Sequence, residues 1–264
     1  MTESSQKMFK HVKPELAVIV PVHNEADNLR PLIDEICTAL SKISEEGEII
    51  YVDDGSSDNS IELLLAIQSN CPQLRVLAHD KCCGQSASIV TGVKAAQANI
   101  IVTIDGDGQN DPADIPVLYR ALQEAENSNH LLVAGFRTKR KDKWIKRVSS
   151  KIANEVRSGL LSDNTPDTGC GLKVFTRTAF LNMPHFDHMH RFLPALMIRQ
   201  GGKVISLKVK HRPRKRGTSN YGTLDRLTVG IIDLFGMLWL QRRANNPEVR
   251  ELVGKGKTPK AKSL

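Results

Sequence analysis

Two hydrophobic patterns alternate along the first half of this chain. Short runs rich in Val, Ile and Leu are typical of buried β-strands, and they predict strands at residues 16–20, 48–53, 74–78, 100–104, 131–135, 172–175 and 203–210. Between the first five runs, apolar residues recur with helical spacing near residues 28–40, 59–68, 85–97 and 112–124. This alternation predicts βα units, and therefore an α/β fold with a mostly parallel, twisted sheet flanked by helices.

The second half of the chain is more basic, and it contains two candidate amphipathic helices. Residues 144–161 place an apolar side chain at every fourth position among Lys and Arg, and residues 227–240 form an apolar run that ends at Arg242 and Arg243. The second run contains Asp233 and is too short to span a bilayer. Either helix suits a membrane surface or the packed core, and the sequence leaves both alternatives open.

These patterns divide the chain into four predicted segments. Residues 1–13 form a polar N-terminal segment, residues 14–222 one large α/β domain, and residues 223–243 an apolar, amphipathic helix. Residues 244–264 are basic and polar, which predicts a disordered tail.

Composition narrows the classes of partner and compartment. The 264 residues carry a formal net charge of +8, which favours anionic partners such as nucleotides, nucleic acid, phosphate-bearing lipids or an anionic membrane. Aromatic residues make up only 5%, which disfavours a protein that stacks single-stranded nucleic acid on aromatic rings. The five cysteines are odd in number and lack a Cys-x-x-Cys pair, which indicates reduced thiols in a cytoplasm and argues against a disulfide framework or a zinc site. We expect Cys82, Cys83 and Cys170 to be small buried residues, and the histidines have no metal-site spacing.

Polar residues follow five of the predicted strands. They are Pro21–Glu25, Asp53–Ser56, His79–Asp80 with the following Gly84 and Gln85, Asp105–Gln109, and Arg137. The carboxyl ends of parallel strands lie along one edge of a sheet, where ligands bind. We therefore expect these groups to converge on one cleft.

The run Asp105-Gly106-Asp107-Gly108-Gln109 offers oxygen ligands directly after a strand. Hard oxygen donors select Mg²⁺ or Mn²⁺, and such sites share the ion with substrate phosphates. We therefore predict Asp105, Asp107 and Gln109 as metal ligands beside a diphosphate. Asp53 and Asp54 have the wrong charge to hold an anion, but their carboxylates suit sugar hydroxyls and base N–H groups.

Several of these segments resemble glycosyltransferase family 2. The shared motifs are PVHNE (21–25), VDDGSSDNS (52–60), GQSASIVTG (84–92) and DGDGQNDP (105–112). Within the family, the chain is similar to the polyprenyl- and dolichyl-phosphate sugar synthases through DTGCGLKVF (167–175), HRFLPAL (190–196) and HRPRKRGTSNYG (211–222). The resemblance covers residues 14 to 240 and implies a single A-type glycosyltransferase fold, with residues 14–222 as the nucleotide-sugar transferase domain.

The resemblance also implies roles for individual residues. Asp105, Asp107 and Arg137 would be catalytic. The nucleotide-sugar site would comprise Pro21, Val22, Asn24, Glu25, Asp53, Asp54, Gly84, Gln85 and Gly106. The acceptor phosphate would be bound by Arg137, Arg212, Arg214, Ser219 and Tyr221. Asn220 stands where the family often has lysine, so one charge contact differs here.

The implied reaction is inverting, metal-dependent transfer of a sugar from a UDP- or GDP-linked donor to a polyprenyl phosphate. Such lipid-linked sugars serve the modification of envelope glycolipids. A phosphate acceptor is largely dianionic at pH 7 and needs cationic positioning, whereas a hydroxyl acceptor needs a general base, for which Asp187 is the candidate. A family 2 enzyme with a glycan or other hydroxyl acceptor remains the alternative, and a basic nucleic-acid-binding protein is a further, disfavoured one. The expected location is cytoplasmic, peripheral on the inner face of the cytoplasmic membrane, with no nucleic-acid partner.

Overall fold

The fold is built on one seven-stranded sheet in the order β3-β2-β1-β4-β6-β5-β7. The computed structural model describes residues 13–43, 47–137, 159–161, 163–213 and 223–245, and side chains of the last segment from residue 229 onward. The strands are β1 (Leu16–Val22), β2 (Glu48–Asp53), β3 (Leu74–Ala78), β4 (Ile100–Thr103), β5 (Leu131–Arg137), β6 (Lys173–Thr176) and β7 (Lys203–Val209). Strand β6 pairs antiparallel with β4 and β5, and the other pairs are parallel. The predicted mostly parallel α/β sheet is confirmed.

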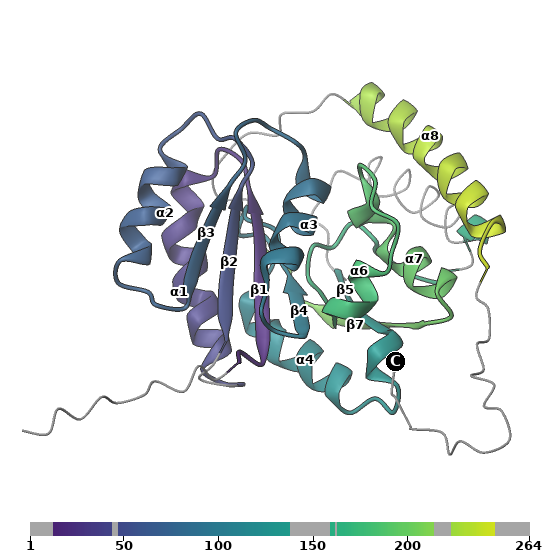
Figure 1. Cartoon of the computed structure of the whole chain (residues 1–264), viewed down its shortest axis with the longest axis horizontal. Helices are drawn as coiled ribbons and strands as arrows, with labels where there is room; N and C mark the ends of the chain where they lie inside the picture. The colour runs from purple at the N-terminus through teal and green to yellow at the C-terminus, as the bar shows by residue number, and fades with distance from the viewer. Residues whose placement is uncertain (1–12, 44–46, 138–158, 162, 214–222, 246–264) are drawn as a thin grey trace, which may run out of the picture.

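Helices cover both faces of the sheet (Figure 1). One face packs against α1 (Ala26–Leu40), α2 (Ser60–Gln68) and α4 (Ile115–Gln123). The other face packs against α3 (Gln85–Ala95), α6 (Arg177–Leu181), α7 (Leu193–Arg199) and α8 (Thr223–Arg242). Short 3-10 helices lie at η1 (Pro112–Asp114), η2 (Ser128–His130) and η3 (Met189–Arg191).

Strand β1 shows why the central strands are continuously apolar. Successive side chains of a strand point to opposite faces, and helices cover both faces here. Leu16, Val18 and Val20 pack in the core on the α1 side, while Ala17 and Ile19 pack in the core on the α3 side. All five are fully buried. Continuous burial explains why the sequence shows unbroken apolar runs.

The predicted elements lie where the pattern placed them, with ends that shift by a few residues. Strand β5 extends to Arg137, two residues beyond the predicted end, and α8 spans residues 223–242 of the predicted helix at 223–243. The candidate helix at 144–161 lies outside the described residues except for Gly159–Leu161, which are helical. The tail from residue 246 and the N-terminal residues 1–12 also lie outside them. Of the helices that the structure describes, none has the length and apolar character needed to cross a bilayer.

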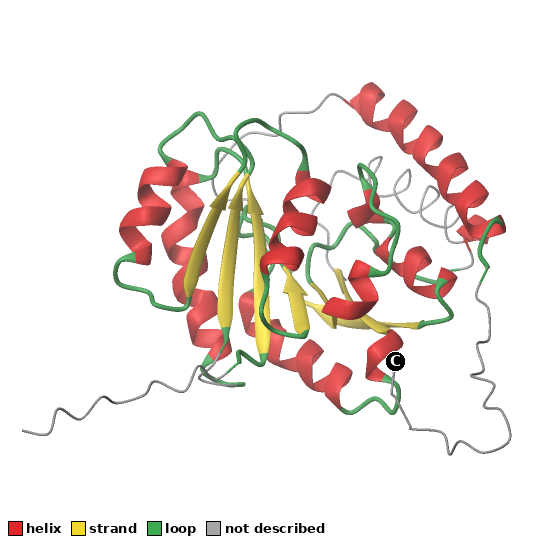
Figure 2. Ribbon diagram, viewed as in Figure 1, coloured by secondary structure: helices red, strands yellow, loops and turns green. Residues whose placement is uncertain are grey.

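The strands end together at one edge of the sheet, as Figure 2 shows for β1, β2 and β3. The pairing register aligns Val22 with Asp53 and Asp53 with Ala78. It also aligns Ile19 with Thr103, so that β1 and β4 end near each other. The polar loops that follow these strands are therefore brought to the same edge, as the sequence predicted.

Close packing of α3 on β1 yields a stability prediction. A Cβ added at Gly92 of α3 would overlap Cγ2 of the buried Ile19, whereas a Cβ at Gly236 of α8 would meet nothing within 4 Å. Replacing a helical glycine by alanine gains about 1 kcal/mol, but overpacking a core costs about 1–3 kcal/mol. We expect Gly92→Ala to lower the free energy of unfolding by about 1–2 kcal/mol and Gly236→Ala to leave it unchanged or raised, as measured by urea unfolding. Equal effects of the two variants would contradict the packing argument.

Candidate active site

The loop after β4 lies directly against the end of β1. A Cβ at Gly106 would lie 2.5 Å from Cγ1 of Val22 and 2.9 Å from the carbonyl oxygen of Pro21, so only glycine fits between the two flanking aspartates. Gly108 has a φ of +69°, a left-handed conformation that favours glycine. The Asp107 carboxylate accepts a hydrogen bond from the backbone N–H of Gln109 at 3.1 Å. The two glycines therefore allow Asp105, Asp107 and Gln109 to follow the strand in one tight turn.

The position of Asp105 disfavours the charged form of its carboxyl group. Burial and, as a smaller cause, the charge of Asp107 raise its pKa from 3.8 to a net value of about 6. The positive charges of Lys173 and Arg137, and a 2.8 Å hydrogen bond from the Gln85 side chain, act in the opposite direction. Two carboxylates that repel each other and consist of hard oxygen donors fit a divalent cation.

Arg137 and Lys173 provide the positive charge of this region, but both are already engaged. Arg137 donates to Asp167 through Nε at 2.6 Å and Nη2 at 2.8 Å. Lys173 is buried and its ammonium donates to the carbonyl oxygens of Thr168 and Cys170. Burial lowers the pKa of Lys173. Sequence reasoning found Arg137 from its place at a strand end but missed Lys173 and Asp167, although both lie in the quoted segment 167–175.

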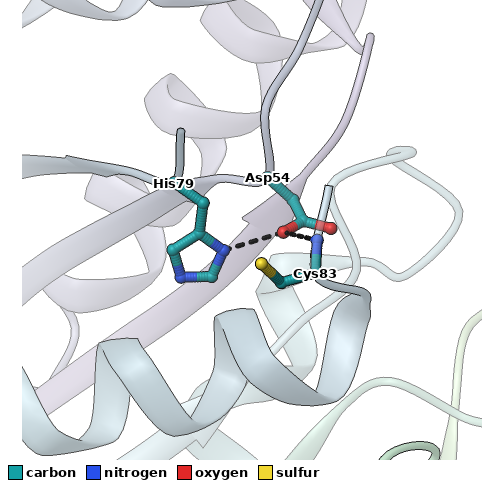
Figure 3. Close-up of side chains that lie close together, drawn as sticks. All are labelled: Asp54, His79 and Cys83. Atoms are coloured by element: carbon teal, nitrogen blue, oxygen red, sulfur yellow. Dashed lines mark hydrogen bonds and ion pairs between the residues drawn. The ribbon is translucent and has the colours of Figure 1, made fainter. Parts of the chain in front are cut away.

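The two aspartates that end β2 have different environments. The Asp54 carboxylate accepts four hydrogen bonds: from His79 Nδ1 (2.8 Å), Cys82 Sγ (3.2 Å), and the backbone N–H groups of Cys83 (2.9 Å) and Gly84 (2.7 Å). Figure 3 shows His79 and Cys83 gathered around it. These bonds hold the loop before α3, and together they lower the pKa of Asp54 although burial opposes this.

Asp53 has one carboxylate oxygen without a hydrogen-bond partner among the described residues, whereas both oxygens of Asp54 accept hydrogen bonds. One oxygen of Asp53 accepts from the backbone N–H of Ser56 at 2.9 Å. Its other oxygen, Oδ1, is buried and lacks a hydrogen-bond partner among the described residues. A buried acceptor without a partner costs free energy, so this atom is suited to accept a donor from a ligand.

The residues after β1 connect the loops at this edge. The Asn24 side chain accepts from the backbone N–H groups of Ser57 (2.7 Å) and Asp58 (3.2 Å). Asn24 itself has a φ of +56°, in the left-handed region that asparagine tolerates. Glu25 accepts from the Asn28 side chain at 2.6 Å. Asn24 and Glu25 also line a surface cavity of about 250 Å³.

Arg212 follows β7 and lies next to the Asp105–Gln109 loop. Its backbone N–H donates to the Gln109 carbonyl at 2.9 Å, and its guanidinium is held by Glu35 (2.7 Å) and Asp111 (2.8 Å). Arg212, Asp107 and Gly108 line a cavity of about 180 Å³. The other predicted acceptor-phosphate residues, Arg214, Ser219 and Tyr221, lie outside the described residues.

A third, smaller cavity of about 50 Å³ lies beside Asp105. Gln85, Asp105, Lys173 and His190 line it. Burial lowers the pKa of His190 to about 3, so the imidazole is neutral at pH 7, and its Nδ1 lies 2.8 Å from the Ser86 hydroxyl oxygen. A Cβ at Gly84 would lie 3.4 Å from the Asp187 carboxylate, which places the candidate base near the same loop. Segments 84–90, 104–107 and 168–193 therefore meet here.

One sequence-based expectation about the cysteines was wrong. Cys170 is buried as expected, but Cys82 and Cys83 are exposed. They lie in the loop that Asp54 holds at the edge of the sheet, where backbone hydrogen bonding fixes the main chain and leaves the side chains at the surface.

Comparison with protein families gives one match that covers most of the chain. The sequence model described as "Glycosyl transferase family 2" matches residues 17–183. A dodecaprenyl-phosphate galacturonate synthase of Rhizobium johnstonii is 30% identical over 237 residues, which is 88% of this chain and 69% of that protein. An undecaprenyl-phosphate 4-deoxy-4-formamido-L-arabinose transferase of Edwardsiella ictaluri is 31% identical over 211 residues. That match covers 79% of this chain and 63% of the relative, which is less than two thirds of its length.

Solved structures share the fold at low sequence identity. A mannosyltransferase from Pyrobaculum calidifontis, in complex with GDP-Man and Mn²⁺, has a TM-score of 0.65 at 18% identity, over 90% of this chain and 67% of that chain. Glucosyl-3-phosphoglycerate synthase from Mycobacterium tuberculosis, in complex with Mn²⁺, UDP and phosphoglyceric acid, has a TM-score of 0.63 at 18% identity, over 88% and 80% of the two chains. These similarities confirm the predicted fold.

Because the pKa of Asp105 is raised, we expect Asp105→Asn to stabilise the metal-free protein at neutral pH. The raised pKa means that protonated Asp105 favours the folded state below about pH 4, and this contribution is lost as the pH rises through about 6. One pKa unit corresponds to about 1.4 kcal/mol, and solvent screens part of it. We expect the free energy of unfolding of Asp105→Asn to exceed that of the wild type by roughly 1–2 kcal/mol near pH 7.5 and by much less near pH 4.5. Urea unfolding in EDTA measures this, and a difference independent of pH would contradict it.

Proposed function

The chain belongs to glycosyl transferase family 2, and we propose that it transfers a sugar from a nucleotide-diphosphate sugar to a polyprenyl phosphate. The observation that carries this proposal is the pair Asp105 and Asp107, whose negative charges repel each other at the sheet edge where the polar loops meet. The two relatives named for polyprenyl-phosphate substrates support the choice of acceptor. The neighbours in complex with GDP-Man or UDP support a nucleotide-linked donor.

The donor site is assigned from the side-chain oxygens of the residues that end β2 and follow β4 at this edge. Asp105, Asp107 and Gln109 supply the oxygen atoms that would hold Mg²⁺ or Mn²⁺, as the oxygen-only donor set favours. The bound ion would neutralise negative charge on the leaving diphosphate. The free Oδ1 of Asp53 suits a donor group of the nucleoside, whereas Asp54 shapes the pocket through the loop that it holds.

The reaction at this site is a single displacement. An oxygen of the acceptor phosphate attacks the anomeric carbon, the bond from that carbon to the diphosphate breaks, and the nucleoside diphosphate leaves with inverted configuration at the sugar. The acceptor is already anionic at pH 7, so this step needs no general base. The residues have to position two anionic substrates in line and exclude water from the sugar.

The acceptor phosphate would approach along the segment after β7. An isolated bridge between Asn110 and His211, together with the Arg212 N–H bond to Gln109, holds the start of this segment against the metal loop. Arg212 is engaged by Glu35 and Asp111, so a phosphate would have to share its guanidinium with two carboxylates. The proposal therefore gives the main role to Arg214, Ser219 and Tyr221, which follow in the sequence, and assigns Arg137 to the charge balance around Asp105.

A transfer assay with paired aspartate variants tests this function. The assay combines a panel of UDP- and GDP-sugars with a short-chain, water-soluble polyprenyl phosphate and Mn²⁺, and identifies the lipid product by mass. We expect Asp107→Ala to lower kcat by about 100-fold or more, because charge on the leaving group loses its stabilisation. Asp187→Asn should keep kcat within about twofold, because a phosphate nucleophile needs no base.

Two outcomes would overturn parts of this function. Near-normal transfer by Asp107→Ala at saturating Mn²⁺ would show that Asp107 does not hold the metal. A loss in Asp187→Asn as large as that in Asp107→Ala would reject the phosphate acceptor and favour a hydroxyl acceptor.

We also propose that α8 places the enzyme on a membrane surface. Its inner side packs in the core, where Met237 is 1% exposed. Its outer side carries an apolar ridge, which we define as Ile231 (47% exposed), Ile232 (70%), Phe235 (65%) and Trp239 (62%). The exposed Arg242 and Arg243 follow the ridge. The sequence left open whether this helix packs in the core or binds a membrane surface. We propose that its inner side does the first and its outer side the second.

Magnitudes indicate which part of α8 would dominate membrane binding. Full burial of a large apolar side chain is worth about 1.5–3 kcal/mol, so the four half-exposed ridge residues offer several kcal/mol. Each arginine near an anionic surface adds about 1 kcal/mol, which salt screens. The ridge therefore contributes most of the binding energy. Because nucleotide sugars are cytoplasmic, we assign this contact to the inner face of the cytoplasmic membrane.

Vesicle sedimentation tests this contact. We expect the wild type to pellet with vesicles of anionic and zwitterionic phospholipid, and salt to weaken the binding without abolishing it. The double variant Phe235→Ser/Trp239→Ser should lose at least about tenfold in apparent affinity. Leu63→Ser/Leu65→Ser is the matched control, because these leucines are also exposed but lie on α2. Equal pelleting of both double variants and the wild type would reject the ridge as the membrane contact.

A further inference from the structure

A second group of metal-ligating side chains lies at the sheet edge, apart from Asp105 and Asp107. Asp54 ends β2, His79 follows β3, and Cys83 lies in the loop before α3. One carboxylate oxygen, one imidazole nitrogen and the thiol sulfur all lie within 4.8 Å of one another. Figure 3 shows the three side chains lying close together. This group could not be predicted from spacing, because its members are separated along the chain and lack the pattern of a metal motif.

The donor atoms differ in kind from those of the Asp105–Gln109 loop. Oxygen, nitrogen and sulfur together are the ligand set that Zn²⁺ takes in proteins, whereas Mg²⁺ and Mn²⁺ prefer oxygen. A carboxylate and a thiolate would balance the two charges of the ion. The protein thus offers two sites of different chemical hardness at one edge of its sheet.

The surroundings of this group already orient two of its ligands. His79 Nε2 lies 2.9 Å from the Thr91 hydroxyl oxygen. If Nε2 donates to Thr91, then Nδ1 keeps its lone pair and faces Asp54, the arrangement that metal-binding histidines use. The Asp54 carboxylate is fixed by the backbone N–H groups of Cys83 and Gly84. Cys82 Sγ, 3.2 Å from the other carboxylate oxygen, provides a second thiol nearby.

We propose that Asp54, His79 and Cys83 bind Zn²⁺ or a similar borderline-soft divalent cation. The cation takes the place of the proton between His79 Nδ1 and Asp54 Oδ1, which now lie 2.8 Å apart. These two atoms must separate by about half an ångström to give tetrahedral Zn–N and Zn–O distances. The Cys83 thiol releases its proton to solvent. The imidazole moves its proton from Nδ1 to Nε2, and Nε2–H then donates a hydrogen bond to the Thr91 hydroxyl oxygen. Water completes the four-coordinate site.

Occupancy of this site inhibits sugar transfer, a consequence that rests on the proposed function. Cys83 Sγ now lies 3.3 Å from the carbonyl oxygen of Lys81, on the outer side of the loop. Binding draws the sulfur toward Asp54 and displaces the main chain that leads into α3. Gln85, two residues later, donates to Asp105 at 2.8 Å, so the displacement reaches the donor site.

Cobalt spectroscopy on the full, tag-free chain tests the site independently of activity. Co²⁺ bound to a thiolate gives a charge-transfer band and visible d–d bands, which Zn²⁺ should abolish by competition. We expect these bands in the wild type and in Asp107→Ala, which lacks a ligand of the other site. Cys83→Ser should lose the charge-transfer band, and Thr91→Val should weaken Co²⁺ binding by about 10- to 100-fold through its effect on His79.

Cys71→Ser is the matched thiol control, because Cys71 lies with Cys37 at an Sγ–Sγ distance of 3.9 Å on the other side of the sheet. The proposal is overturned if the wild type shows no thiolate band, or if Cys71→Ser removes the band and Cys83→Ser keeps it. In the transfer assay at saturating Mn²⁺, Zn²⁺ should inhibit the wild type and spare Cys83→Ser. Cobalt bands without zinc inhibition would overturn the inhibition and leave the binding site standing, whereas a transfer assay without product would bear only on the proposed function.

Discussion

The charge balance around Asp105 is the constraint on which the rest of the site depends. Burial disfavours the charged form of Asp105, and the charge of Asp107 adds to this effect, whereas the charges of Lys173 and Arg137 oppose it. The two cations are already bound, Arg137 by Asp167 and Lys173 by backbone carbonyls. The raised pKa of Asp105 is the net result of its burial and of these opposing charges. A divalent cation at the proposed metal site would offset the burial and the repulsion, which would explain why the fold tolerates a destabilising carboxylate at this point.

Strand β6 brings the second half of the chain into this balance. It is inserted antiparallel between β4 and β5, which places Gly171 and Lys173 beside Asp105. A Cβ at Gly171 would overlap the Asp105 carboxylate, so the close approach requires glycine. The sequence predicted this strand but not its direction, because parallel and antiparallel strands have the same two-residue period. Lys173, which opposes the charge of Asp105, was missed for the same reason.

Local patterns predicted which residues reach the sheet edge, but not how each side chain is used there. Strand ends follow from hydrophobic runs, so the positions of Asp53, Asp105 and Arg137 could be predicted. The partners of the arginines could not, since Asp167 lies 30 residues from Arg137 and Glu35 lies 177 residues from Arg212. The same limit applies to the difference between Asp53, which has one buried oxygen without a partner among the described residues, and Asp54, whose four donors all come from the loop after β3.

The attachment of α8 explains how a lipid-bearing substrate could be presented to a cleft in water. Arg199 donates to the Leu240 carbonyl, and Gln241 donates to the Leu161 carbonyl, so the end of the helix is fixed to the domain. Asp233 lies 3.0 Å from His188, in the loop whose His190 lines the cavity beside Asp105. A helix held at these points keeps its apolar ridge at a fixed height relative to the cleft. If the ridge makes the proposed membrane contact, a phosphate at the bilayer surface would reach the donor while its chain stays in the membrane, which a flexible tether would not ensure.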